Sequence, residues 1–317
     1  MIHSALLDIN GPWMDALGWM LIHSLWQGMV WALLLVLALS FIARKRSETR
    51  YFASWVALMG MSAGMLITFI YYAWEPGFAS SNTTEYIVQQ AALVDSLYGN
   101  EVIANHYWMH WVETQLPNIV LFWMIGIALL TLRWTGGWIY AHRLKYRGTQ
   151  PVPAGWQEQF DRLKKQLQVS RDIGLKLSRK IDTPAIIGHL KPVVLMPIAL
   201  VNALEPREVE AILVHELTHI ARRDYLWHLV QIVLETVCFY HPGVWYISRQ
   251  LRKERENACD AAALRQTGTP ALYANTLVKL QELKGRQPAL AMAFGGGKRQ
   301  STFFQRIQRI LYPNAKN

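Results

Sequence analysis

Two histidines and a glutamate stand at a spacing that could bind a metal ion and hydrolyse an amide bond. Residues 215–219 read His-Glu-Leu-Thr-His. On a helix, His215 and His219 lie one turn apart on the same face, so both imidazoles can reach one ion. Glu216 lies beside them, where it can take a proton from an attacking water. The motif therefore predicts a hydrolytic zinc site.

A zinc site of this kind needs a third protein ligand and one open position. No histidine follows at the spacing of the longer HExxHxxGxxH pattern, so a downstream acid must supply the ligand. The candidates are Glu235, Glu254 and Glu256. We favour Glu256, because it shares a helical face with Asp260, which can orient a ligand histidine from behind. The sequence thus predicts one Zn²⁺ ion held by His215, His219 and Glu256.

The elements around the motif are predicted from periodicity and punctuation. Glu205-Pro206 begins a helix, since proline suits the first helical position and apolar residues follow at helical spacing. Residues 150–203 suggest a mixed α/β segment, with a helix over 156–167 and short strands over 173–177 and 192–196. Further helices are expected over 256–264 and 270–283. The 182–197 region could offer an edge strand to an extended peptide substrate; a plain structural hairpin is the alternative.

Three apolar stretches, 16–43, 52–74 and 117–140, are long enough to cross a bilayer. Basic residues cluster at 44–50 and 142–147, whereas 75–116 contains no Lys or Arg, which places the N-terminus outside. We therefore expect an α-helical membrane protein with a cytoplasmic α+β zinc metallopeptidase domain. The predicted boundaries are a membrane domain at 1–141, with an external 75–116 loop, and a peptidase domain at 142–317.

A fourth apolar run, 225–247, cannot be a single span, because it would put His219 and Glu256 on opposite sides of the membrane. It also contains Pro242, which breaks helices. We predict a buried or re-entrant helical element, with a two-helix hairpin dipping into the bilayer as the alternative.

Several motifs resemble the BlaR/MecR-type family of membrane metallopeptidases, the antirepressor sensor-transducers of bacteria. These are HELTHIARRD at 215–224, FYHPGVW at 239–245 and RKERENACD at 252–260, supported by 182–197 and 293–311. His241 departs from the family, which usually carries Asn before the proline. The resemblance implies a gluzincin-like zinc endopeptidase in a bacterial cell (inner) membrane that cuts a cytoplasmic repressor. It also implies a supporting role for Asp224.

Two other function classes stay open: a membrane quality-control or prenyl-type zinc protease, and a signalling scaffold with structural zinc. The expected partners are a protein or peptide substrate and the lipid bilayer, with a homodimer left open. Juxtamembrane placement explains the basic clusters without direct nucleic-acid binding. No Ser-x-x-Lys occurs, so β-lactam sensing by this chain is not expected.

Four further expectations concern the carbonyl-stabilising donor, the C-terminal helix and the two cysteines. The donor that would stabilise the reacting carbonyl is unresolved among His189, His228, His241 and Arg222. Residues 301–311 form an amphipathic helix that docks on the domain, or else lies on the membrane. Cys238 and Cys259 remain free thiols. Cys259 should also turn away from the helical face that carries Glu256.

Overall fold

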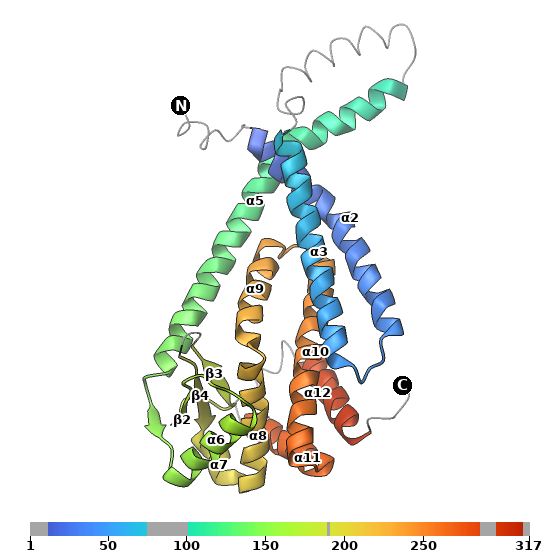
Figure 1. Cartoon of the computed structure of the whole chain (residues 1–317). Coiled ribbons are helices and arrows are strands. Elements are labelled where there is room, and N and C mark those ends of the chain that lie inside the picture. The colour runs from blue at the N-terminus through green and yellow to red at the C-terminus, as the bar shows by residue number, and fades with distance from the viewer. Residues whose placement is uncertain (1–11, 75–100, 189–190, 286–295, 313–317) are drawn as a thin grey trace. The chain divides into compact units, whose positions relative to one another are not determined.

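The computed structural model describes residues 12–74, 101–188, 191–285 and 296–312 (Figure 1). These residues form two compact units that the chain enters more than once. Unit 1 contains 12–42, 52–74, 101–132 and 234–250. Unit 2 contains 43–51, the described residues of 133–233, and those from 251 onward. The sequence predicts a single boundary near residue 141, whereas each unit of the described structure is built from several separate segments of the chain.

Three helices of the described structure are long and apolar enough to span a membrane. They are α2 (Pro12–Phe41), α3 (Ser47–Trp74) and the segment Trp111–Leu144 of α5 (Glu101–Leu144). The three predicted spans are therefore confirmed as helices. Pro117 lies inside α5 without ending it. Within the predicted external loop, residues 101–116 are helical, and residues 75–100 lie outside the described structure.

The apolar run 225–247 is not one element. α9 (Asp224–Val237) ends before a turn, and α10 (Pro242–Thr267) begins at the proline. This is the order of elements in the hairpin alternative, with the break at Pro242 as expected. Within unit 1 the turn packs against membrane helices: the Tyr240 and Ser24 hydroxyls lie 2.7 Å apart, and the Cys238 sulfur lies 3.5 Å from that of Met65.

Aromatic and imidazole side chains bond several of the polar backbone groups at this turn. Trp123 and Trp245 donate their indole N–H groups to the carbonyls of Val237 and Phe239. His241 Nδ1 accepts the amides of Gly243 and Val244, which caps α10, and Nε2 lies 3.0 and 3.1 Å from the carbonyls of Ser24 and Leu25. Helix ends in an apolar medium require such partners, so this turn suits a bilayer interior.

Unit 2 contains a four-stranded sheet in the order β1-β2-β4-β3. The strands are β1 (Thr149–Pro151), β2 (Gly174–Ser178), β3 (Ala185–Ile187) and β4 (Val193–Pro197). β2 and β4 are the two strands that the sequence predicts, and they pair in parallel. β3 pairs antiparallel with β4 and is an edge strand of this sheet. The 182–197 region is therefore a hairpin with an edge.

α8 (Pro206–Ala221) carries the HExxH motif and starts where the sequence predicts. Glu205 is its N-cap, and Glu208 completes a capping box by accepting the Glu205 amide at 3.0 Å. After the helix, Arg223 has a φ of 56°, in the left-handed region. This sharp corner lets α9 begin at Asp224 and brings that carboxylate back toward α8.

One apolar core joins the sheet to the helices of unit 2. α6 (Ala154–Gln166) supplies Phe160, β4 supplies Val194 and α8 supplies Leu213. α11 (Pro270–Gly285) and α12 (Gly296–Leu311) pack on the same core through Tyr273 and Ile310. The docking prediction for 301–311 is thus confirmed. The prediction of a helix confined to 256–264 is too short, since α10 runs from 242 to 267.

Candidate metal centre

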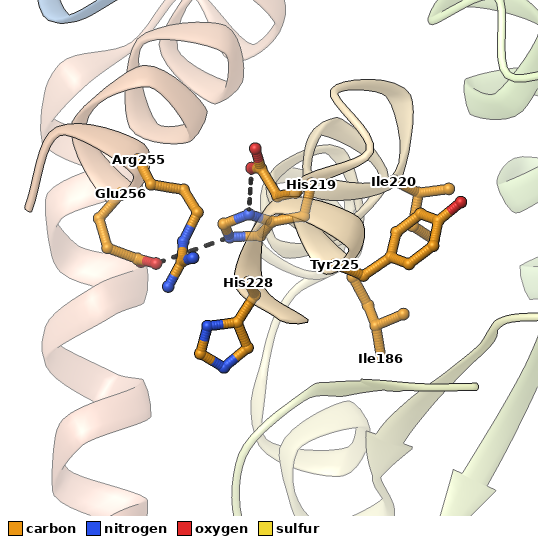
Figure 2. A pocket seen from close by; sticks show the side chains of 8 residues that line it. Ile186, His219, Ile220, Tyr225, His228, Arg255 and Glu256 are labelled. Atoms are coloured by element: carbon orange, nitrogen blue, oxygen red, sulfur yellow. Dashed lines mark hydrogen bonds and ion pairs between the residues drawn. The ribbon is translucent and has the colours of Figure 1, made fainter. Parts of the chain in front are cut away.

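Three donor atoms converge where α8 meets α10. His219 Nε2 lies 3.8 Å from Glu256 Oε1 (Figure 2), and His215 Nε2 lies 3.6 Å from Glu256 Oε2. All three ligand atoms fall within 4.8 Å of one another. Tetrahedral donors at about 2.1 Å from zinc stand about 3.4 Å apart. The separations therefore suit one zinc ion. Two nitrogens and one oxygen would bind it and leave the fourth coordination position open.

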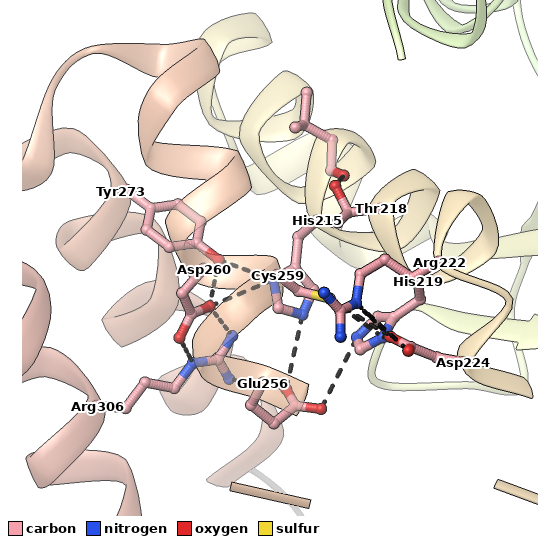
Figure 3. Close-up of polar contacts among 11 residues, drawn as sticks. His215, Thr218, His219, Arg222, Asp224, Glu256, Cys259, Asp260, Tyr273 and Arg306 are labelled. Carbon is pink, nitrogen blue, oxygen red and sulfur yellow. Dashed lines mark hydrogen bonds and ion pairs between the residues drawn. The ribbon is translucent and has the colours of Figure 1, made fainter. Parts of the chain in front are cut away.

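Each histidine is held from behind by its own carboxylate. His219 Nδ1 lies 2.8 Å from Asp224 Oδ2, and His215 Nδ1 lies 3.3 Å from Asp260 Oδ1 (Figure 3). A carboxylate on Nδ1 favours the tautomer whose Nε2 lone pair is free for metal. Both imidazoles thus present the nitrogen that faces Glu256.

Asp260 is the centre of a buried polar network. Arg306 of α12 binds it with two parallel hydrogen bonds, of 2.6 Å from Nε and 2.5 Å from Nη2. The Tyr273 hydroxyl of α11 donates to Asp260 at 2.8 Å and lies 3.0 Å from His215 Nδ1. Arg306 also approaches Glu256 at 3.6 Å. Two helices outside the motif therefore fix the outer side of the site.

The electrostatics keep both carboxylates ionised. Burial would raise the pKa of Glu256, but its hydrogen bond with His215 and the nearby cationic groups lower it to about 2. Burial also opposes ionisation of Asp260, yet the Arg306 charge holds its pKa below the usual range. For His215, burial lowers the pKa, but the Asp260 and Glu256 carboxylates outweigh it and raise the pKa to about 9. Metal must therefore displace a proton from His215.

A pocket of about 220 Å³ opens beside His219 and Glu256 (Figure 2). Its wall comes from β3, the α8–α9 corner and α10, through Ile186, His219, Ile220, Asp224, Tyr225, His228, Arg255 and Glu256. The metal-ligand cluster and an edge strand thus border the same space. Glu216 lies on α8 between the two histidines and is partly exposed.

The other predicted candidates separate by position. Glu254 is bound to Arg50 at 2.8 Å rather than to the histidines, and Glu235 belongs to unit 1. His228 lines the pocket, whereas His241 caps α10. His189 lies outside the described residues. Arg222 is tied to Asp224 at 3.3 Å.

Sequence reasoning missed three contributors. From the sequence, Tyr273 is indistinguishable from an ordinary buried aromatic residue, and Arg306 from an ordinary charge on the polar face of a helix. The sequence predicts that Cys259 turns away from the face of Glu256, but its sulfur lies 3.3 Å from His219 Nδ1 and 3.7 Å from Asp224 Oδ2. It is fully buried, and burial together with the Asp224 charge raises its pKa, which keeps it a thiol. The second group of potential ligands, His219, Asp224 and Cys259, thus gathers around the Nδ1 atom of His219.

Membrane-length helices and a His-His-Glu cluster, both present in the described residues, are features of membrane-anchored metallopeptidases. The sequence profile of the family described as BlaR1 peptidase M56 matches residues 22–310. The chain therefore belongs to that family, as the motifs predicted.

Individual relatives are distant. The chain is 24% identical to the regulatory protein BlaR1 of Bacillus licheniformis over 54% of its own length, and to the methicillin resistance mecR1 protein of Staphylococcus aureus over 30%. These matches cover 29% and 16% of the relatives, so the chain spans less than a third of either. It is also 28% identical to protease HtpX homolog 2 of Methanosarcina acetivorans, over 31% of this chain and 45% of that protein.

Proposed function

We propose that this chain is a membrane zinc endopeptidase of the gluzincin type that cuts a cytoplasmic regulatory protein in signal transduction. One observation carries the proposal. Two histidines, each backed by a carboxylate on Nδ1, direct Nε2 toward Glu256 at the wall of an open pocket. A structural zinc site would have four protein ligands and no adjoining space, which argues against the scaffold alternative.

The chain's own residues have separate roles in the proposed reaction. His215, His219 and Glu256 hold the zinc, which when bound polarises the scissile carbonyl and acidifies water. Glu216, next to His215 on α8, accepts the proton of the attacking water and returns it to the leaving amine. Among the candidate donors in the described residues, His228 lines the pocket. We assign it the role of donating a hydrogen bond to the substrate carbonyl oxygen.

Substrate binding would use the edge of the sheet. β3 pairs with β4 on one side, and Ile186 at its centre lines the pocket. An extended peptide can pair with the other side of β3 through its main chain, which delivers a peptide bond beside Glu256 with little demand on sequence. This arrangement suits a protein substrate better than a small molecule.

The proposed topology follows from charge and from the turn at 238–241. Basic clusters at 44–50 and 142–147 favour the cytoplasmic side of a bacterial inner membrane for these segments, and the candidate metal site lies in the same unit as both. Side chains bond several polar backbone groups of the turn, which belongs with the membrane-length helices in unit 1. We therefore propose that the 225–247 segment enters the bilayer from the cytoplasm and returns.

A survey of new protein N-termini tests the function. Cells would express the wild type or Glu216→Gln, which keeps the three metal ligands and removes the general base. Fragments of a cytoplasmic regulator that appear only with the wild type support the proposal. Fragments of membrane proteins would instead favour the quality-control alternative, which the similarity to protease HtpX homolog 2 supports. Proteolysis would be refuted if the wild type and Glu216→Gln both contain zinc and the cells that express them show the same set of protein N-termini under every inducing condition.

A further inference from the structure

The connection between the first two membrane helices belongs to the same unit as the metal site. Residues 43–51 comprise the link after α2 and the first residues of α3 (47–51), and they cluster with unit 2 rather than with the rest of those two helices. We call the stretch 43–51 the connection. Its side chains reach two places, the corner between α8 and α9 and the middle of α10. These are the segments that hold the three metal ligands.

The first contact reaches His219 through two intermediate side chains. Glu48 pairs with the Nη1 of Arg222, whose guanidinium also lies over the Tyr51 ring at 5.3 Å. Arg222 Nε lies 3.3 Å from Asp224 Oδ2, the same oxygen that lies 2.8 Å from His219 Nδ1. The orientation of one metal-binding imidazole thus depends on an arginine that the connection holds.

The second contact reaches the segment of α10 that carries Glu256. Arg50 Nε donates to Glu254 Oε1 at 2.8 Å, and the side chains are only 12% and 2% exposed. Glu254 Oε2 accepts from Asn257 at 3.0 Å, so Glu254 is bonded on both sides. A buried pair of this kind is costly to break from one side, because the remaining charge has no solvent.

Arg309 of α12 fastens the backbone of the connection. It donates to the Arg44 carbonyl at 3.0 Å and lies 3.9 Å from Glu254. α12 also supplies Arg306 to Asp260. The connection, α12 and α10 therefore share one set of charge contacts around the ligand helix.

We propose that the 43–51 connection is a positioning element of the metal site, with Arg50 and Arg222 as its positioning residues. It fixes His219 through Arg222 and Asp224, and Glu256 through Glu254. A displacement of α2 against α3 would thereby alter the spacing of the zinc ligands. This inference rests on the proposed zinc site, and it identifies the part of the chain through which membrane helices would control it.

The test uses the full chain in lipid nanodiscs, with zinc and Co²⁺ as probes. Arg50→Gln is compared with Arg46→Gln, an exposed arginine on the same connection. We expect Arg50→Gln to weaken zinc binding 10–100-fold in chelator competition and to change the visible Co²⁺ spectrum, which reports ligand geometry. Arg50→Lys should restore part of the affinity, and Arg46→Gln should match the wild type.

Glu48→Gln covers the case in which Arg50→Gln does not fold, since the Glu48 side chain is 68% exposed and tolerates change. A two- to fivefold faster release of zinc from this variant supports the inference. Wild-type affinity and spectrum in whichever of these two variants folds would overturn it. Wild-type protein that binds no zinc would instead overturn the proposed function, so the two failures are distinguishable.

Discussion

Replacing Arg306 with glutamine should weaken the metal site from a distance. The change removes both hydrogen bonds to Asp260, whose side chain is 6% exposed. Breaking a buried pair from one side costs about 3–5 kcal/mol. Tyr273 still donates to Asp260, so we expect the lower end, about 3 kcal/mol of unfolding free energy. Asp260 then gains a proton more readily and holds His215 less firmly.

Two measurements on the purified full chain follow this change. Chelator competition should show zinc affinity reduced 10–100-fold, which corresponds to about 1.4–2.8 kcal/mol. Denaturant unfolding without metal should show the loss of stability. Arg265→Gln is the matched control, since it makes the same substitution at an exposed position near the end of α10.

A double-mutant cycle makes the reasoning refutable. Arg306→Gln and Asp260→Asn should be far from additive, because either change alone breaks the same bidentate pair. Additive losses of zinc affinity would mean that Arg306 acts elsewhere, as would an Arg306→Gln variant that binds zinc like the wild type.

Three further outcomes follow from the described contacts. Tyr273→Phe removes the hydroxyl between Asp260 and His215, and should cost about 1–2 kcal/mol of stability and speed zinc release in a chelator assay; unchanged release would exclude Tyr273 from the site. In chelator-treated protein, the raised pKa of His215 stabilises the fold below pH 6.5, and this contribution is lost as pH rises toward 9. Unfolding free energy should therefore fall by up to about 3 kcal/mol over that window, while a flat profile would contradict the assignment. His241→Ala should destabilise the detergent-solubilised chain by about 1–2 kcal/mol through loss of the α10 cap, and His241→Asn should recover most of it; equal unfolding midpoints for the two variants would argue against capping.

The convergence of the three candidate ligands is predictable from local sequence, because it depends on helical spacing. His215 and His219 share a face on any helix, and Glu256 with Asp260 repeats that logic on a second helix. The start of α8 is also predictable from local sequence, since a proline at the first position and a capping acid are enough to begin the helix. The break at Pro242 belongs to the same group.

The rest of the site depends on packing between distant elements. Tyr273 differs from a plain core aromatic by one hydroxyl, and only the packing of α11 against α8 makes that atom matter. Cys259 shows the same limit, because local sequence does not predict the α8–α9 corner whose His219 and Asp224 meet its sulfur. The sequence predicts Arg50 as one of the basic residues that orient the membrane helices, a role that does not prevent it from pairing with Glu254.

The wide sequence separations within the site have a consequence for folding kinetics. The histidine pair forms as soon as α8 does, whereas Tyr273 meets His215 across 58 residues and Arg306 meets Asp260 across 46. Closing loops of this length costs about 3–4 kcal/mol each in chain entropy. A metal ion bound by residues of both α8 and α10 would stabilise the fold only after the two helices have come into contact. Zinc should therefore slow unfolding much more than it speeds folding, so the ion would govern the lifetime of the folded peptidase domain in the membrane.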